Sequence, residues 1–284
     1  MKKFFYVFVL LFLIFNLQYR LEEIRKVKEK AEEIIYLPKG KILKYLFGGE
    51  KNSFADFLWL NFIQYYGHHL QTDRKFPYLY QILDVLTELD EKFLHAYTFG
   101  SVLLAHDCKD REKSEKLLKK GIYNNPLKWE YYFWFGFLNY TFFKDYEKAG
   151  RYFRLSSKKP GAPESAYRWA AFVYYKKLKK LELSLILWDE LYRNSKNEFE
   201  KNIALSYIKL TLHKIHLRDL NRALREFIKN EKRLPKNLDE MVYKKYIKSI
   251  PEDPLGGKYY IQKDLIISTK TPKIFIPEID ELLN

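Results

Sequence analysis

The sequence predicts an all-α protein built from paired antiparallel helices, and three observations lead to this prediction. Helix breakers are scarce, because the 284 residues include only 11 glycines and 10 prolines. Such a composition favours long helices joined by short turns. Hydrophobic residues make up 47% of the chain, enough apolar material to offset the entropy lost on ordering. Finally, one pattern of residues recurs about every 35 positions.

Residues 1–35 are predicted to form a membrane anchor that continues as one long helix. A basic start, Met1-Lys2-Lys3, precedes an unbroken apolar run over 4–15, and the apolar stretch extends to residue 19. As a helix, residues 4–19 would span about 24 Å, slightly less than a hydrocarbon core of about 30 Å. The stretch contains no Ala, Gly or Ser and so lacks the small residues that precede a signal-peptide cleavage site. We therefore expect an uncleaved signal anchor, with a cleaved signal peptide as the alternative.

The distribution of charge predicts the orientation of this anchor. Lys2, Lys3 and the amino terminus lie on one side, whereas the flank 20–33 carries five basic and five acidic residues. The positive-inside rule then places the N-terminus in the cytoplasm. The chain is expected to be a single-pass protein of the inner (cytoplasmic) membrane, with most of its residues outside the cytoplasm.

The middle of the chain repeats a pattern of core positions. A first residue, small in three of four cases, is followed by further core residues four and seven positions later. The sets lie 35 residues apart: Leu79, Leu83 and Leu86; Ser114, Leu118 and Gly121; Ala149, Phe153 and Ser156; Ser184, Trp188 and Leu191. A second series, at steps of 34 to 36, comprises Tyr65-Tyr66, Gly100, Gly136 and Ala170. Small residues at matching points let two helices approach closely, so the two series predict a helix A and a helix B in each unit.

Together with the closing Pro126 and Pro160, this pattern resembles the tetratricopeptide repeat (TPR) family over residues 54–232. Four units are clear and a fifth is weaker. Leu79 replaces a small residue, the third unit ends at Asn197 without a proline, and units one and two are read as carrying insertions between their helices. The resemblance implies a right-handed α-solenoid, and an irregular helical bundle is the alternative. Residues 36–53 are expected to be a linker broken at Pro38 and Gly40, with Ser53 as the N-cap of the first repeat helix.

The C-terminal segment 233–284 changes character. Residues 236–249 predict one short helix, and the prolines and glycines of 251–257 predict a turn. Lys258–Gln262 and Leu265–Thr269 are β-rich and flank Lys263-Asp264, a hairpin pattern. The Asp-Pro, Gly-Gly and Tyr residues of this stretch resemble the ends of type II secretion pseudopilins. The other interpretation, which we favour, is a cap over the last repeat.

Composition and motifs argue against several classes of function. The formal net charge is +15, but Lys and Arg are interleaved with Glu and Asp and no nucleic-acid-binding motif accompanies them. The single cysteine excludes an internal disulfide, and the histidines match no zinc spacing. No P-loop, dinucleotide-binding or nucleophile-elbow motif is present. We expect no enzyme activity, cofactor, metal, nucleic acid or small-molecule substrate. The residues considered for a metal were His68, His69, His95, His106, Cys108, His213 and His216.

The TPR resemblance implies a concave groove lined by the A helices. In the family register its residues are Phe62, Tyr66, Tyr97, Ser101, Phe133, Phe137, Tyr140, Tyr167, Ala171 and Tyr174, with Glu130 and Glu164 at the rim. Tyrosine and phenylalanine bury a large area on binding, and tyrosine keeps a polar tip. The alternative is that half of these residues only pack helix A on helix B. If they bind a partner, Tyr140 and Tyr174 should be more exposed than the helix B residues Phe153 and Trp188.

These features predict a membrane-anchored scaffold that binds a protein or peptide partner in its groove. We expect it to act in the assembly of a cell-envelope complex of the pilus or secretion type. A purely structural subunit of a membrane complex is one alternative, and a cryptic hydrolase or metal binder is another.

Overall fold

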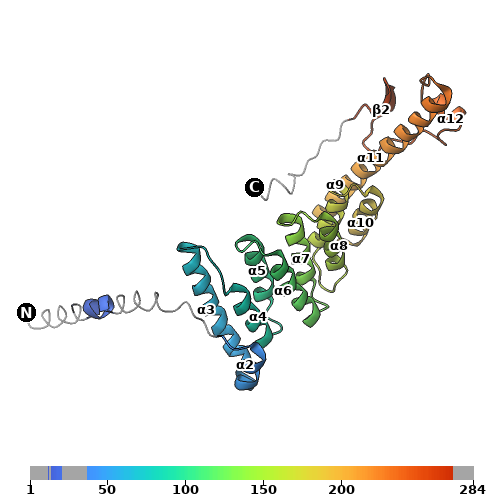
Figure 1. Cartoon of the computed structure of the whole chain (residues 1–284). Coiled ribbons are helices and arrows are strands. Elements are labelled where there is room, and N and C mark those ends of the chain that lie inside the picture. Colours follow the sequence, from blue (N-terminus) through green and yellow to red (C-terminus); the bar gives the residue numbers. More distant parts are fainter. Residues whose placement is uncertain (1–11, 13, 21–36, 271–284) are drawn as a thin grey trace, which may run out of the picture. The chain divides into compact units, whose positions relative to one another are not determined.

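The computed structural model describes residues 12, 14–20 and 37–270 (Figure 1). Most of the predicted anchor over 4–19, the predicted continuation to residue 35, and residues 271–284 lie outside the described residues. Among the described residues, no helix is both long enough and apolar enough to cross a bilayer. The chain divides into two compact units, residues 1–96 and 97–284, and this division falls inside the predicted repeat array.

The described part of unit 1 contains α2 (Gly40–Phe47), a 3-10 turn (Gly48–Glu50), α3 (Lys51–Gln71) and α4 (Leu79–Leu89). The prediction of a linker over 36–53 was therefore wrong from Gly40 onward. Gly40 does not break a helix but opens one, and it lies so close to α4 that an added Cβ would be 2.7 Å from the Cβ of Glu88. Ser53 lies inside α3, where its hydroxyl donates to Glu50 Oε2 at 3.1 Å, and so it is not the N-cap.

Unit 2 confirms the paired helices and their period. The A helices are α5 (Leu94–His106), α7 (Trp129–Thr141) and α9 (Glu164–Lys176), and the B helices are α6 (Arg111–Asn124), α8 (Tyr146–Ser157) and α10 (Leu181–Asn194). Successive A helices begin 35 residues apart, and so do successive B helices. The insertion predicted between helix A and helix B of the second repeat is therefore absent. From α6 to α11, helices that follow one another in the chain pack side by side (Figure 1). The right-handed twist stays a prediction.

The turns between helix A and helix B are the most regular part of the repeat. Lys109, Lys144 and Lys179 all take the left-handed conformation, with φ of 52°, 55° and 53°. The next residue in each turn donates its backbone N–H to a carbonyl six residues earlier, at 2.9 Å in all three turns. This bond satisfies a carbonyl that the end of helix A would leave unpaired. The sequence repeat therefore extends to the backbone geometry of the turn.

Small residues lie where each helix B crosses its helix A. Ser114, Ala149 and Ser184 are fully buried, as their place in the pattern predicts. The hydroxyl of Ser114 donates to the Ser101 carbonyl at 2.8 Å, and that of Ser184 donates to the Ala171 carbonyl at 2.9 Å. The helix A residues at the crossing are thus Ser101, Gly136 and Ala171, exactly regular at 35 residues, rather than Gly100, Gly136 and Ala170.

The predicted fifth helix pair is instead one continuous helix, α11 (Glu198–Glu231). Beyond it come α12 (Leu238–Tyr243), which is shorter than the helix expected over 236–249, and the strands β1 (Tyr259–Gln262) and β2 (Leu265–Ser268). The strands pair antiparallel around Lys263-Asp264, so the predicted hairpin is confirmed. The first half of α11 contributes to the core of the repeats, and the second half shares a separate core with α12 and the hairpin.

Candidate partner-binding surface

Six of the ten predicted groove residues are part of the protein core. The side chains with 6% exposure or less are Phe62, Tyr97, Ser101, Tyr140, Ala171 and Tyr174. Tyr140 and Tyr174, at 3% and 6%, are slightly more exposed than Phe153 and Trp188, which are at 0%. All four side chains are nevertheless buried, so the tyrosines pack helix A on helix B. The expectation that Tyr140 and Tyr174 present a surface to a partner is corrected accordingly.

The remaining predicted residues, Tyr66, Phe133, Phe137 and Tyr167, are half-buried. Tyr66 belongs to unit 1, where it stacks on Phe76 with ring centroids 5.3 Å apart. In unit 2, Phe133 and Phe137 lie on α7, and their ring centroids are 6.4 and 6.3 Å from that of Trp169 on α9. These two residues therefore belong to an aromatic group that joins two successive A helices.

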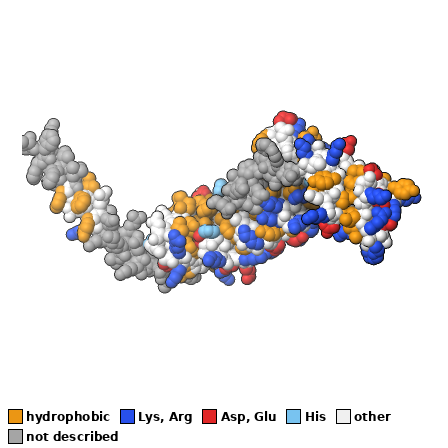
Figure 2. All heavy atoms as spheres, turned by 90° about the horizontal axis from the view of Figure 1, so that it is seen from above, with side chains coloured by type: hydrophobic (Ala, Val, Ile, Leu, Met, Phe, Trp, Pro, Cys, Tyr) orange, Lys and Arg blue, Asp and Glu red, His pale blue; other side chains and the backbone are white. Residues whose placement is uncertain are grey.

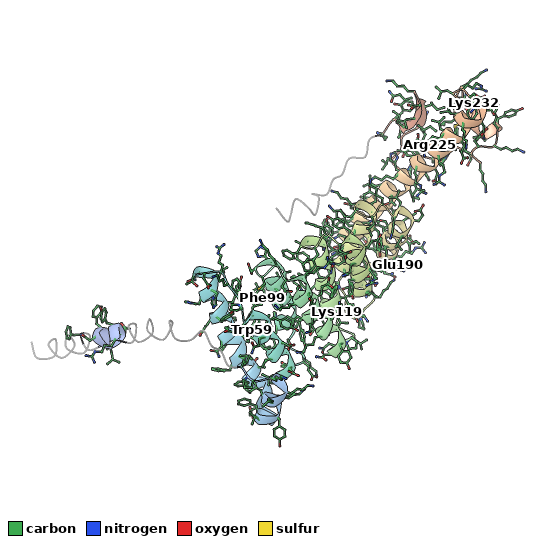
Figure 3. All side chains as sticks on the ribbon, viewed as in Figure 1. Trp59, Phe99, Lys119, Glu190, Arg225 and Lys232 are labelled. Carbon is green, nitrogen blue, oxygen red and sulfur yellow. The ribbon has the colours of Figure 1, made fainter. Side chains whose placement is uncertain are left out.

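Two tryptophans that the sequence reasoning missed complete this group. Trp134 lies 5.3 Å from Phe137, and both Trp134 and Trp169 are half-buried. We call Phe133, Trp134, Phe137 and Trp169 the aromatic cluster. The 35-residue period could have identified the tryptophans, because Phe99, Trp134 and Trp169 are spaced at that step. Phe99 is 44% exposed and projects from α5 (Figure 3).

The buried side chain of Phe153 packs against the aromatic cluster. Gly136 has no side chain, and a Cβ there would lie 2.9 Å from Phe153 Cδ1, so Phe153 of α8 can reach under α7. Phe153 in turn stacks on Trp169 at 5.2 Å and contacts Phe133 at 5.2 Å. A fully buried ring thus supports the half-buried ones. Rigid, partly exposed aromatic side chains are the type of group that dominates binding energy at protein interfaces.

Unit 2 also carries the positive charge of the chain. Residues 97–270 contain 36 Lys and Arg against 21 Asp and Glu, a difference equal to the +15 of the whole sequence. Basic and acidic side chains are interspersed over the visible surface (Figure 2). Some of these charges join successive helix pairs: Arg111 bonds Asp145 at 2.9 Å and Lys148 bonds Glu115 at 3.1 Å. The excess of positive charge favours an acidic partner.

The predicted rim residues Glu130 and Glu164 have different surroundings. Glu164 Oε1 accepts the backbone N–H of Lys196 at 3.1 Å, which ties α9 to the turn after α10. Glu130 Oε2 is buried and has no hydrogen-bond partner among the described residues. Glu164 is therefore engaged within the fold, and Glu130 retains an acceptor beside the aromatic cluster on α7.

A polar cluster connects α11 with the C-terminal hairpin. His213 Nδ1 and Asp253 Oδ1 are 2.8 Å apart, and both side chains are almost fully buried. Asp253 also accepts from the Ser268 hydroxyl through Oδ2 and from the Leu255 N–H at 3.0 Å. The carboxylate thus lies between the serine and the histidine. In a serine nucleophile site the histidine takes this central place, so the arrangement suits a structural clamp and not an activated serine.

This clamp should weaken in acid. Burial opposes ionisation of Asp253, but bonds from Ser268, Leu255 and His213 outweigh it and lower the pKa below 3.8. The side chain of His216 contacts the Tyr259 hydroxyl, and burial of the imidazole disfavours its charged form and so lowers the pKa of His216. Both groups bind more protons when unfolded, so their stabilisation is present above the unfolded pKa values and lost as pH falls through the folded ones. We expect the hydrogen-exchange protection of β1 and β2, measured relative to the intrinsic exchange rate at each pH, to fall below pH 6.5 and again below pH 3.8. Asp253→Asn should abolish the second step, and protection independent of pH would contradict the assignment.

The other candidate ligands are separate from one another. His69 bonds Asp73 at 2.7 Å and His106 bonds Asp107 at 2.8 Å. Burial, followed by the charges of Asp107 and Asp110, raises the pKa of the Cys108 thiol, which disfavours the reactive thiolate. Within the described residues, no group of three or more His, Cys, Asp or Glu side chains could hold a metal ion.

Comparisons of the sequence with protein-family models and with curated proteins gave no match.

Proposed function

We propose that this protein is a membrane-anchored, TPR-like scaffold that binds an acidic protein or peptide on the A-helix surface of unit 2. The observation that carries the proposal is the row formed by Phe99, Trp134 and Trp169. These rings recur at the 35-residue step on α5, α7 and α9, and each keeps part of its surface in solvent. Partly exposed aromatic residues in register on packed helices are suited to an elongated partner.

The cellular role follows from the predicted anchor and the absence of an enzyme motif. With residues 4–19 in the inner membrane, the repeats would hold a partner close to the bilayer during assembly of an envelope complex of the pilus or secretion type. The resemblance of the segment from Pro251 onward to pseudopilin ends supports this setting. Neither an enzyme activity nor a cofactor is part of the proposal.

Photo-crosslinking from individual positions tests where the partner binds. With benzoylphenylalanine at Phe99 or Trp134 in the full chain, we expect crosslinks to one partner. The matched control is Tyr192 on α10, which is 39% exposed but lies on a B helix. Equal crosslinking at Tyr192, or none at Phe99 and Trp134, would favour a structural subunit held in its complex by other surfaces.

Once the partner is identified, Trp134→Ala should weaken its binding by about 2 kcal/mol or more, roughly a 30-fold rise in Kd, as for an aromatic hot spot. Isothermal titration calorimetry measures this change directly. Tyr192→Ala provides the control and should leave Kd unchanged. Raising the salt concentration should also weaken binding, because the partner is expected to be acidic. A Kd that is the same for all three proteins would show that the aromatic row is only packing.

A further inference from the structure

The helices that follow the predicted anchor in the sequence expose an unusual amount of apolar surface. Within residues 40–71 of unit 1, eight large hydrophobic side chains are exposed, whereas the 174 described residues of unit 2 have twelve. They are Ile42, Tyr45, Leu46, Phe47, Phe57, Leu60, Ile63 and Leu70. Contiguous exposed apolar surface in a folded protein marks an interaction site.

The exposed residues of the two helices are connected. Phe47 at the end of α2 stacks on Phe54 of α3 with centroids 4.0 Å apart, and Phe54 lies 6.3 Å from Phe57. Phe57, Leu60 and Ile63 follow at steps of three and so lie on neighbouring parts of one side of α3. Leu58 and Phe62, on the other side, are buried. The core of unit 1 therefore already accounts for the inner side of α3, and the exposed side is a separate surface.

This surface has few charges, and those near it are mainly basic. Charged residues make up 31% of the chain, yet the 21 residues of α3 include only Lys51 and Asp56. The preceding segment adds Lys39, Lys41 and Lys44 against Glu50, and of these lysines Lys44 pairs with Glu91 at 2.6 Å. Apolar and aromatic residues flanked by lysines are the composition of helices that lie in the interface of an anionic bilayer.

We propose that the outer sides of α2 and α3 form a lipid-contact surface that lies in the headgroup region of an anionic membrane. The inference rests on the anchor in the proposed function. Seventeen residues, 20–36, separate the predicted span over 4–19 from Leu37, so Leu37 can lie no more than about 60 Å from it even with a fully extended chain. The excess of lysine favours anionic lipid over a second copy of the chain, which would bring like charges together.

An environment-sensitive label on the proposed surface tests the contact. In a Cys108→Ser background, which removes the one native cysteine, the full chain carries NBD at Leu60→Cys and is reconstituted in vesicles of phosphatidylcholine and phosphatidylglycerol. We expect a blue shift and about a twofold rise in emission as water is excluded. Lipids with a nitroxide near the headgroup should quench the label. NBD at Ser206→Cys, an exposed position on α11, should show neither effect.

Three outcomes would overturn the inference. The first is an emission spectrum at residue 60 that matches residue 206 although the protein floats with the vesicles. The second is a blue shift that disappears in nanodiscs holding one protein each, since this would assign the surface to a second copy. The third is equal quenching in pure phosphatidylcholine, which would remove the role of the lysines.

The same preparation separates failure of this inference from failure of the anchor. If the protein washes off the vesicles with salt, or if the native protein begins near residue 21, the proposed anchor is wrong. The lipid-contact surface, which rests on that anchor, is then overturned with it. As a folding-neutral check, Phe57→Ser with Leu60→Ser replaces two exposed residues, at 59% and 60%. This variant should keep its helical circular dichroism while a label at Ile63→Cys loses most of its quenching; unchanged quenching would argue against the surface.

Discussion

Phe153→Ala should reduce the free energy of unfolding of the repeats by about 3–5 kcal/mol, the range for truncating a fully buried phenylalanine. Phe153 is 0% exposed and contacts Phe133 and Trp169, and it fills the space that Gly136 leaves open. The side chains around it cannot collapse easily, because they belong to two different A helices. The cavity should therefore persist, and the loss should lie near the upper end of the range.

Hydrogen exchange of the full chain in detergent measures this change locally. Protection in α7 to α9 should fall most, since the repeat array transmits stability between neighbouring helices. Leu155→Ala is the matched control: it removes a large side chain from the same helix, but Leu155 is 42% exposed, so the change should stay within about 0.5 kcal/mol. Equal losses for the two variants would mean that Phe153 does not support the aromatic cluster.

Asp253→Ala should destabilise the C-terminal cap by about 3–5 kcal/mol, as expected when one member of a buried polar pair is removed. The change leaves the His213 ring, the Ser268 hydroxyl and the Leu255 N–H without the acceptor that each now contacts. Unsatisfied buried groups pay their full desolvation cost. The cap should open without unfolding α7 to α10.

Exchange in β1, β2 and α12 reports this opening. Glu252→Ala is the matched control. It removes the same negative charge from the neighbouring residue, whose side chain is exposed, and it should change exchange little. Asn221 provides a second link, because its side-chain amide donates to the Ile266 carbonyl and accepts the Ile266 N–H, both at 2.8 Å. If the hairpin stays fully protected in Asp253→Ala, this amide pairing rather than the clamp holds the cap.

The sequence predicted the regular part of the fold because its physical cause is local. Ser114, Ala149 and Ser184 are small where two helices cross, and this requirement recurs in the three helix pairs of unit 2. The hairpin was predictable for the same reason, since β-rich residues flank a two-residue turn. The groove was harder to predict. A shift of one residue along a helix turns a side chain by about 100°. Tyr140 and Tyr174 were therefore assigned to the surface, whereas Trp134 and Trp169 were missed.

The errors at the edges of the array have other causes. The sequence predicts a helix break at Gly40, but glycine also serves where backbones approach closely, and only the tertiary contact with Glu88 distinguishes the two uses. The sequence also predicts a fifth helix pair, because nothing in it marks the end of the period. The step of 35 places the next left-handed turn at Lys214, yet this residue lies inside α11, with its ammonium 4.0 Å above the Tyr175 ring. No glycine or proline interrupts residues 198–231, so nothing local ends the helix there.

The continuity of α11 has a consequence for how the protein unfolds. At 1.5 Å per residue its 34 residues extend about 51 Å. One rod is therefore a member of two cores, with Tyr207 and Leu210 in the first and Leu224 and Phe227 in the second. In a linear array each unit is stabilised mainly by its neighbours, and the terminal unit usually frays first. Here fraying of α11 from its C-terminal end would have to break a helix in its middle, so the second half of α11 should stay helical when β1 and β2 detach and should unfold together with the last repeat.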